Sequence, residues 1–180
     1  MGRSYDEINN ATAAWIERQH MFFTATAPAA GGHVNVSPKG LDTFRITGPN
    51  EVAYLDLTGS GAETIAHIRD NGRVTIMFCA FEGPARIVRL YGTGSYIPAT
   101  DPEFAAAAAP FGDQHGARSV ITVAVDLVSD SCGYAVPKYE YVEQRKRLTD
   151  WSEQRTDEDL VEYWATRNAQ SIDGLPALAD

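Results

Sequence analysis

The sequence predicts a mainly β fold: a closed or half-closed antiparallel barrel of six or seven strands, decorated by helices. Short apolar runs alternate with Gly- and Pro-rich turns through most of the first 131 residues. Helical patterns flank this region and interrupt it once near its middle. The chain has 180 residues, of which 44% are hydrophobic, so it can build one sizeable core. We therefore expect a folded globular chain rather than a disordered or disulfide-framework one.

The first half of the chain is predicted to hold two helices and four strands. Ser4 and Glu7 form a capping-box pattern that predicts a first helix of about four turns. Ser60 and Glu63 form a second such pattern, which predicts a helix of roughly ten residues ending at Gly72. Between the two helices, the turns predict short strands at residues 21–27, 33–37, 43–47 and 51–57.

The second half of the barrel is predicted to hold the longest strands. Val, Ile, Tyr and Phe are abundant in two runs that a Glu-Gly-Pro turn separates, which is typical of a hairpin of central strands. An alanine run predicts a short helix, and a last alternating run predicts a final strand. These elements are expected at residues 73–81, 85–97, 103–109 and 118–131.

Beyond Pro137 the chain becomes charged and helical in pattern. One helical segment is expected at residues 139–150, and Thr156 with Asp159 predicts the start of another. We therefore divide the chain into a barrel domain, residues 1–135, and a C-terminal helical extension, residues 136–180. The extension is expected to pack on the barrel or on a partner subunit.

Charge and composition exclude several classes of function. The chain has 24 acidic and 15 basic residues, a formal net charge of −9. Nucleic acids and anionic membranes are poor partners for such a chain, because both are bound by dense positive surface. No apolar run approaches the length of a membrane span, and the first residues do not resemble a signal peptide. Cys79 and Cys132 lie far apart in sequence, so we expect reduced thiols and a cytoplasmic protein.

Searches for common catalytic motifs find none. The four histidines lack metal-ligand spacing, so no metal site is expected. The sequence has no Gly-x-Ser-x-Gly nucleophile motif and no phosphate-binding P-loop. We therefore expect no dedicated catalytic side chain.

Three groups of polar residues occur at positions where a strand pattern does not require them. In the first, alternation places His33, Asn35 and Ser37 on one face of a strand, with Lys39 just beyond it. Amide, hydroxyl and ammonium groups then follow one another along that face. The alternative interpretation is the solvated face of an edge strand.

The second group lies where a strand ends and a helix begins. Ser60 and Gly61 can expose hydroxyl and backbone N–H groups at a helix N-terminus, where phosphates bind. The alternative is that Ser60 only caps the helix. Glu63 disfavours a phosphate unless its carboxylate folds back onto the cap.

The third group consists of Arg86 and Arg89 in a strand-like run. A buried arginine needs an anionic or hydrogen-bonding partner. Alternation places the two on opposite faces. We therefore expect one of them to reach a ligand and the other to pair with a carboxylate such as Asp56 or Asp126.

The order and spacing of these motifs over about residues 5–130 resemble the FMN-binding split-barrel family named for pyridoxamine 5′-phosphate oxidase. The resemblance implies a six-stranded Greek-key split barrel, a homodimer, and FMN in each of two grooves at the subunit interface. It implies that the strand residues contact the isoalloxazine edge and the ribityl chain of FMN. It also implies that residues at the helix start, with help from Arg86, contact the phosphate. The cofactor-binding residues that it implies are Val34, Asn35, Val36, Ser37, Lys39, Tyr54, Asp56, Ser60, Gly61, Thr64 and Arg86.

The chain departs from the pyridoxamine-phosphate oxidases of this family in two places. Their Arg-Lys pair at the phosphate is Glu63-Thr64 here, and the Arg-x-His-x-Arg segment that holds their substrate is absent from residues 139–180. We therefore expect an FMN-dependent oxidoreductase that transfers hydride or electrons to or from another small molecule.

Three alternatives remain open. The first keeps the fold but binds the deazaflavin F420 or haem, with His33 or His67 as a possible axial ligand. The second is a non-catalytic flavin-binding stress-response protein. The third is a dimeric split barrel that has lost its ligand.

Overall fold

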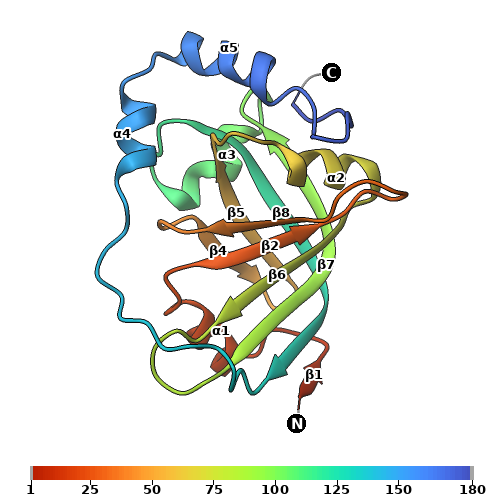
Figure 1. Ribbon diagram of the computed structural model, residues 1–180, viewed down its shortest axis with the longest axis vertical. Coiled ribbons are helices and arrows are strands. Elements are labelled where there is room, and N and C mark those ends of the chain that lie inside the picture. Colours follow the sequence, from red (N-terminus) through yellow and green to blue (C-terminus); the bar gives the residue numbers. More distant parts are fainter. Residues whose placement is uncertain (1, 179–180) are drawn as a thin grey trace.

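One curved antiparallel sheet forms the body of the molecule in the computed structural model, which describes residues 2–178. Seven strands are ordered β3-β2-β6-β7-β8-β5-β4, and the short β1 pairs with β8. The sheet curls into the half-closed barrel that the sequence predicts (Figure 1). The strands are β1 (Arg3–Tyr5), β2 (Phe22–Thr26), β3 (Asn35–Lys39), β4 (Phe44–Gly48), β5 (Glu51–Leu57), β6 (Arg73–Cys79), β7 (Ile87–Pro98) and β8 (Ala117–Ser131).

The helices gather at the two ends of the barrel. Figure 1 shows α2 and α5 at one end, which we call the α2 end, and α1 with β1 at the opposite end, which we call the α1 end. None of the helices in residues 2–178 is both long enough and apolar enough to cross a membrane. The helices are α1 (Asn10–Ile16), α2 (Glu63–Asn71), α3 (Phe104–Ala108), the 3₁₀ turn η1 (Ala109–Phe111), α4 (Arg147–Glu153) and α5 (Asp157–Arg167).

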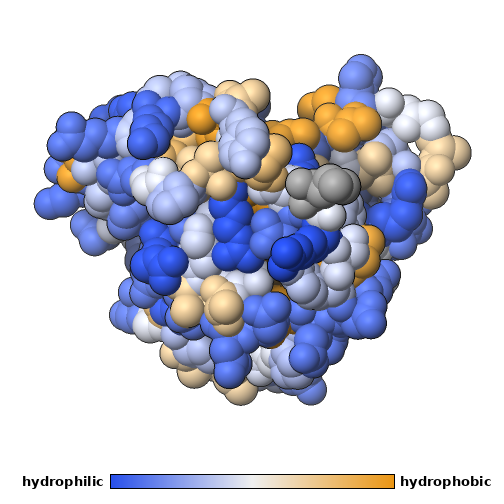
Figure 2. All heavy atoms as spheres, turned by 90° about the horizontal axis from the view of Figure 1, so that it is seen from below, coloured by the Kyte–Doolittle hydropathy of each residue, from blue (hydrophilic) through white to orange (hydrophobic). Residues whose placement is uncertain are grey.

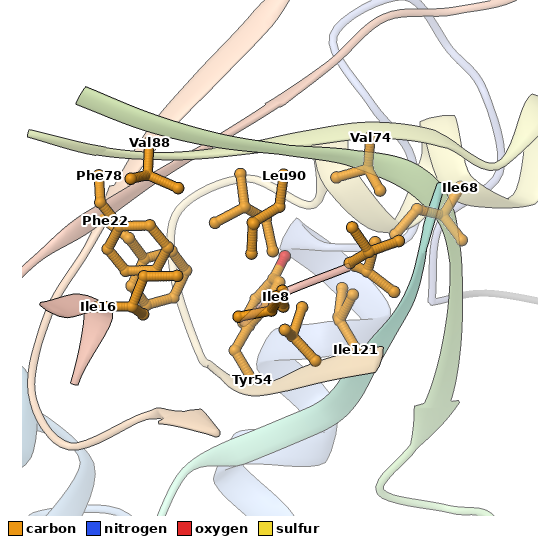
Figure 3. Packing of buried hydrophobic residues seen from close by; sticks show 14 of the residues in the cluster. Ile8, Ile16, Phe22, Tyr54, Ile68, Val74, Phe78, Val88, Leu90 and Ile121 are labelled. Carbon is orange, nitrogen blue, oxygen red and sulfur yellow. The ribbon is translucent and has the colours of Figure 1, made fainter. Parts of the chain in front are cut away.

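The core fills the inside of the barrel because alternate residues of each strand point inward. Phe78, Leu90 and Ile121 from three different strands are fully buried there (Figure 3). The β7–β8 register shifts between Tyr91 and Gly92. A Cβ on Gly92 would overlap the Ala124 carbonyl oxygen, so only glycine allows this approach.

Both predicted capping boxes in the first half of the chain are wrong. Ser4 lies in β1, where it pairs with Ser129, and α1 is instead capped by Asn9. The residue that precedes α2 is Ala62, which makes no side-chain cap, so Ser60 does not cap this helix. Strand pairing and loop geometry outweigh a local Ser-x-x-Glu pattern at both positions.

The predicted helix at residues 139–150 is also wrong over most of its length. Residues 137–146 form an irregular segment, and only α4 is helical. Tyr139 stacks on Phe81 at 5.6 Å, and Tyr141 stacks on His20 at 3.7 Å. Tyr139 and Tyr141 are two residues apart in sequence, and both rings pack against residues of the barrel region. Residues with that spacing do not share a face of a helix, so these contacts favour an extended segment. The capping box that starts α5 at Thr156 is confirmed.

Candidate functional site

The polar face of β3 lies at an open edge of the sheet. Within residues 2–178, β3 pairs only with β2, so no other strand of that range uses its outer backbone groups. The predicted alternation holds within β3, where Val36 is 59% exposed and Asn35 and Ser37 are half-buried, but not before the strand, where His33 is exposed as Val34 is. The Ser37 hydroxyl donates to Asn35 Oδ1 at 3.1 Å, and Asn35 Nδ2 donates to Thr64 Oγ1 at 3.2 Å. These bonds join the edge strand to the start of α2.

A buried carboxylate lies beside this edge. Asp56 is 1% exposed and accepts from Lys39 Nζ and from Arg118 Nε, both at 2.7 Å. Burial alone would raise the pKa of Asp56, but the two cations outweigh burial and lower that pKa to about 2. Asp56 is therefore ionised at neutral pH and holds Lys39 at the end of β3. Arg118 also donates to Asn168 Oδ1 at 2.8 Å, which extends the network into the C-terminal segment.

The loop before α2 presents open hydrogen-bond donors. Because Ala62 provides no side-chain cap, the first N–H groups of α2 are not satisfied by a capping residue. Ser60 and Gly61 are exposed, and the nearest atom to a Cβ on Gly61 would be 3.6 Å away. Hydroxyl and N–H groups can therefore meet an anion here, together with Thr64.

The C-terminal segment fixes the same loop from the other side. Trp164 Nε1 donates to Thr58 Oγ1 at 2.7 Å, and Asn168 Nδ2 donates to the Gly59 carbonyl oxygen at 3.1 Å. Figure 1 shows the segment that follows α5, up to residue 178, lying beside α2. The division at residue 135 is not tested by these contacts and stays a prediction.

Glu63 is engaged by the C-terminal segment as well. Its carboxylate accepts from the Ile172 N–H at 3.1 Å. The same carboxylate also borders the start of α2, because its Oε1 would lie 3.6 Å from a Cβ on Gly61. Glu63 remains the one acidic side chain in the first turn of that helix.

The expected role of the Tyr54 side chain is corrected by its position. Tyr54 is 0% exposed and lies among the apolar residues of the core (Figure 3). Burial, and to a lesser extent the nearby Asp56 charge, raise the pKa of its phenol. A ligand on the surface of this chain cannot reach that side chain.

Arg86 is the second residue whose expected position is corrected. It precedes β7 at the α1 end, where it pairs with Asp130 at 2.6 Å. The Ser60–Thr64 turn lies at the α2 end, so the two do not meet within one chain (Figure 1). Neither Asp56 nor Asp126 is the partner of Arg86, and Arg89 contacts the Ser131 hydroxyl.

Two cavities lie along the same side of the barrel, beneath residues 137–146. One of about 850 Å³ is bordered by Lys39, Ser60 and Trp151, and we call it the Lys39 cavity. The other, of about 1090 Å³, is bordered by Trp15 and Arg86, and we call it the Arg86 cavity. Within residues 2–178, no group of three or more His, Cys, Asp or Glu side chains could hold a metal ion.

The family model described as pyridoxamine 5′-phosphate oxidase matches residues 8–144. This chain belongs to the pyridoxamine 5′-phosphate oxidase family. It is 40% identical over 191 aligned positions to the pyridoxamine 5′-phosphate oxidase family protein ustO of Aspergillus flavus. That alignment covers 97% of this chain and 77% of the relative.

Solved structures show that the chain has the split-barrel fold of the pyridoxamine 5′-phosphate oxidase family. HupZ from Group A Streptococcus superposes with a TM-score of 0.54 at 24% identity, over 67% of this chain and 91% of that one. An FAD binding protein from Mycobacterium smegmatis superposes with a TM-score of 0.50 at 11% identity, over 71% and 97% of the two chains. At these identities the likeness concerns the fold alone.

The donor set at the α2 end fits the phosphorylated end of a flavin such as family members would carry. Asn35, Ser60 and Thr64 offer neutral donors beside an uncapped helix start, and the nearest atom to a Cβ on Gly61 would be Glu63 Oε1 at 3.6 Å. Against the fit stands the carboxylate of Glu63, both oxygens of which accept from the Ile172 N–H, at 3.1 and 3.3 Å. The fit is therefore that of a site built from hydroxyl and N–H groups.

Arg118, Asn168 and Trp164 are parts of the site that sequence reasoning missed. Arg118 carried a usable signal, because it is a charged residue at the start of an apolar strand and therefore needs a buried partner. Asn168 and Trp164 carried none, since their partners lie 50 and 106 residues away in sequence.

Proposed function

We propose that the chain is an FMN-dependent oxidoreductase whose flavin lies along the β3 edge, with its phosphate at the start of α2. One observation carries this proposal: the polar face of β3, the Lys39–Asp56 pair and the uncapped start of α2 converge on one edge of the barrel. Family membership supports a flavin, since a protein of the same fold is an FAD binding protein. Bound FMN would supply hydride or electron transfer.

The proposed phosphate site uses hydrogen bonds rather than paired cations. Thr64 and Ser60 would donate hydroxyls, and the first N–H groups of α2 would complete the cradle. Thr64 is only 6% exposed and its Oγ1 already accepts from Asn35 Nδ2, so its hydroxyl would meet the anion from beside the Asn35 amide.

Lys39 is the residue that we propose tunes the bound cofactor. Its ammonium is held by Asp56 at 2.7 Å, and the Lys39 side chain, which is 21% exposed, borders the Lys39 cavity. A fixed positive group beside the flavin stabilises negative charge as it develops. Lys39→Ala is therefore expected to lower the midpoint potential and the affinity of FMN, whereas the exposed Lys138→Ala leaves both as in the wild type. If the potential and affinity of Lys39→Ala also match the wild type, this role is wrong.

We also propose a homodimer. One outward-facing row crosses the sheet from Val36 through Ala25, Thr75 and Tyr91 to Leu127. Val36 is 59% exposed and Leu127 is 39% exposed. Apolar side chains on such a sheet face favour cover by a second copy of the chain.

Haem is disfavoured by the positions of both candidate ligands. His67 is 0% exposed, and its Nδ1 bonds the Thr26 hydroxyl at 2.9 Å, so it cannot reach a surface groove. His33 is engaged by Asp173 at 2.7 Å. No observation favours F420 over FMN.

The experiment that tests the proposed function is the analysis of the purified protein for a released cofactor, followed by turnover. A yellow protein that releases FMN on denaturation and oxidises a reduced nicotinamide with an electron acceptor supports it. FMN release without turnover would show a flavin-binding protein and not an enzyme. A colourless protein that takes up F420 or nothing would overturn the proposal.

A further inference from the structure

The Arg86 cavity is large, aromatic and separate from the proposed phosphate site. It lies at the α1 end, since Tyr5 of β1 and Trp15 of α1 border it, and Figure 2 shows the molecule from that end. At about 1090 Å³ it exceeds what a small aromatic molecule needs. Its wall includes Trp15, Phe81, Tyr139 and Tyr141.

Arg86 is held rigidly at this wall. Its Nε and Nη2 donate to Asp130 Oδ2 at 3.0 and 2.6 Å, and Nη2 also donates to Thr12 Oγ1 at 3.1 Å. The guanidinium lies over the Trp15 ring with its carbon 4.8 Å from the centroid. Among residues 2–178, no hydrogen-bond partner occupies Arg86 Nη1. One edge of a fixed guanidinium is thus left for a further acceptor.

The remaining charges of the cavity do not select either sign of ligand. Arg3 and Arg18 are balanced in number by Glu82 and Glu140. Glu82 is already engaged, because it accepts from the Tyr141 N–H at 3.0 Å. Arg86 is therefore the group whose geometry is fixed and whose donors are incompletely used.

The aromatic walls are also pre-organised. Phe81 and Tyr139 stack at 5.6 Å, and His20 and Tyr141 stack at 3.7 Å. These pairs leave ring faces and edges exposed, since Tyr139 remains 64% exposed. Flat apolar rings are matched by flat apolar ligands.

We propose that the Arg86 cavity binds a small planar aromatic carboxylate, whose carboxylate accepts from Arg86 Nη1 while its ring packs among Trp15, Tyr139 and Tyr141. The binding itself does not depend on a flavin. His20, Met21 and Tyr141 border both this cavity and the Lys39 cavity. A role for the ligand as substrate or electron acceptor rests on the proposed function.

The experiment is calorimetric titration of the full chain with 2-naphthoate and with 2-naphthamide, which has the same ring without the charge. The wild type is expected to bind the carboxylate at least about fivefold more tightly, as one charge-assisted hydrogen bond implies. Arg86→Gln is expected to bind the two probes equally. Arg45→Gln is the matched control, because Arg45 also pairs with an aspartate and lies over an aromatic ring but is outside the cavity.

Asp130→Asn gives a test in the opposite direction, which does not depend on the stability of Arg86→Gln. It frees Arg86 from its counter-charge, so 2-naphthoate is expected to bind more tightly and 2-naphthamide unchanged. Tyr139→Ala is expected to lower the affinities of 2-naphthoate and 2-naphthamide by the same factor. The proposal is overturned if the wild type binds neither probe, shows no preference, or keeps its preference in Arg86→Gln.

Titrations with and without FMN separate this proposal from the proposed function. Binding of 2-naphthoate by a chain that never takes up FMN would leave the cavity assigned and remove only the flavin role. FMN binding without a preference for 2-naphthoate would support the flavin and overturn the assignment of the Arg86 cavity.

Discussion

Asp56→Asn removes the central charge of the network that links β3, β5, β8 and the C-terminal segment. The substitution keeps the shape of the side chain but leaves Arg118, whose side chain is 4% exposed, without its carboxylate. Breaking a buried ion pair by removing one partner costs about 3–5 kcal/mol. The pKa of Asp56 is lowered from 3.8 to about 2, and this shift gives a second measure of how much the ionised carboxylate stabilises the fold. It corresponds to about 2 kcal/mol of stability at neutral pH.

The assay is urea unfolding of the wild type and Asp56→Asn between pH 7 and pH 2. Because the folded pKa is lowered, the ionised carboxylate stabilises the protein above its unfolded pKa of 3.8, and this contribution is lost as the pH falls through about 2. The free energies of unfolding of the two proteins are therefore expected to differ by about 3 kcal/mol at pH 7. That difference is expected to shrink below pH 4.

Asp42→Asn is the matched control, since Asp42 also pairs with an arginine at 2.7 Å but has a side chain that is 82% exposed. Exposed pairs contribute at most about 1 kcal/mol, so this variant is expected to unfold close to the wild type. The reasoning is refuted if Asp56→Asn is as stable as the wild type, or if the difference between them is the same at pH 7 and pH 2.

Three further outcomes follow from particular residues. Glu63→Gln removes the negative charge at the start of α2 but keeps an acceptor for the Ile172 N–H, so FMN affinity measured by fluorescence titration is expected to rise about threefold; an unchanged affinity contradicts the phosphate position. Thr156→Ala removes the α5 capping box and is expected to lower the free energy of unfolding by about 1 kcal/mol in urea titrations, and no change would contradict the cap. Val36→Glu places a charge on the outward sheet face, so light scattering is expected to show monomers where the wild type shows dimers; a wild-type monomer overturns the proposed dimer.

The strands could be predicted from the sequence because their signal is local. Turn residues identify 51–57 as β5, and the alternation around Asn35 separates the two faces within β3. Strand boundaries differ from the prediction where pairing with a neighbouring strand sets them. β3 continues to Lys39 through Pro38, because an edge strand tolerates a proline. Ser4 and Ser60 misled because each carries a local capping pattern that tertiary contacts override.

The site could be predicted only in part, because its contacts are distant in sequence. The resemblance assigned Asn35, Lys39 and Thr64 to one cofactor site, and the structure joins Asn35 to Thr64 and Lys39 to Asp56 by two separate hydrogen bonds. It could not tell that Arg86 lies at the opposite end of the barrel, since a motif order carries no position in space. Nor can local patterns reveal pairs such as Trp164 with Thr58.

The central claim is that FMN binds with its phosphate held by Thr64 and the start of α2. Its most direct test is a comparison of the affinities of FMN and riboflavin, which differ only in the phosphate, for the wild type and Thr64→Val. The account predicts that the wild type binds FMN at least about tenfold more tightly than riboflavin. It also predicts that Thr64→Val narrows this ratio, whereas Thr166→Val on α5 does not. Equal affinities of the wild type for FMN and riboflavin would contradict it.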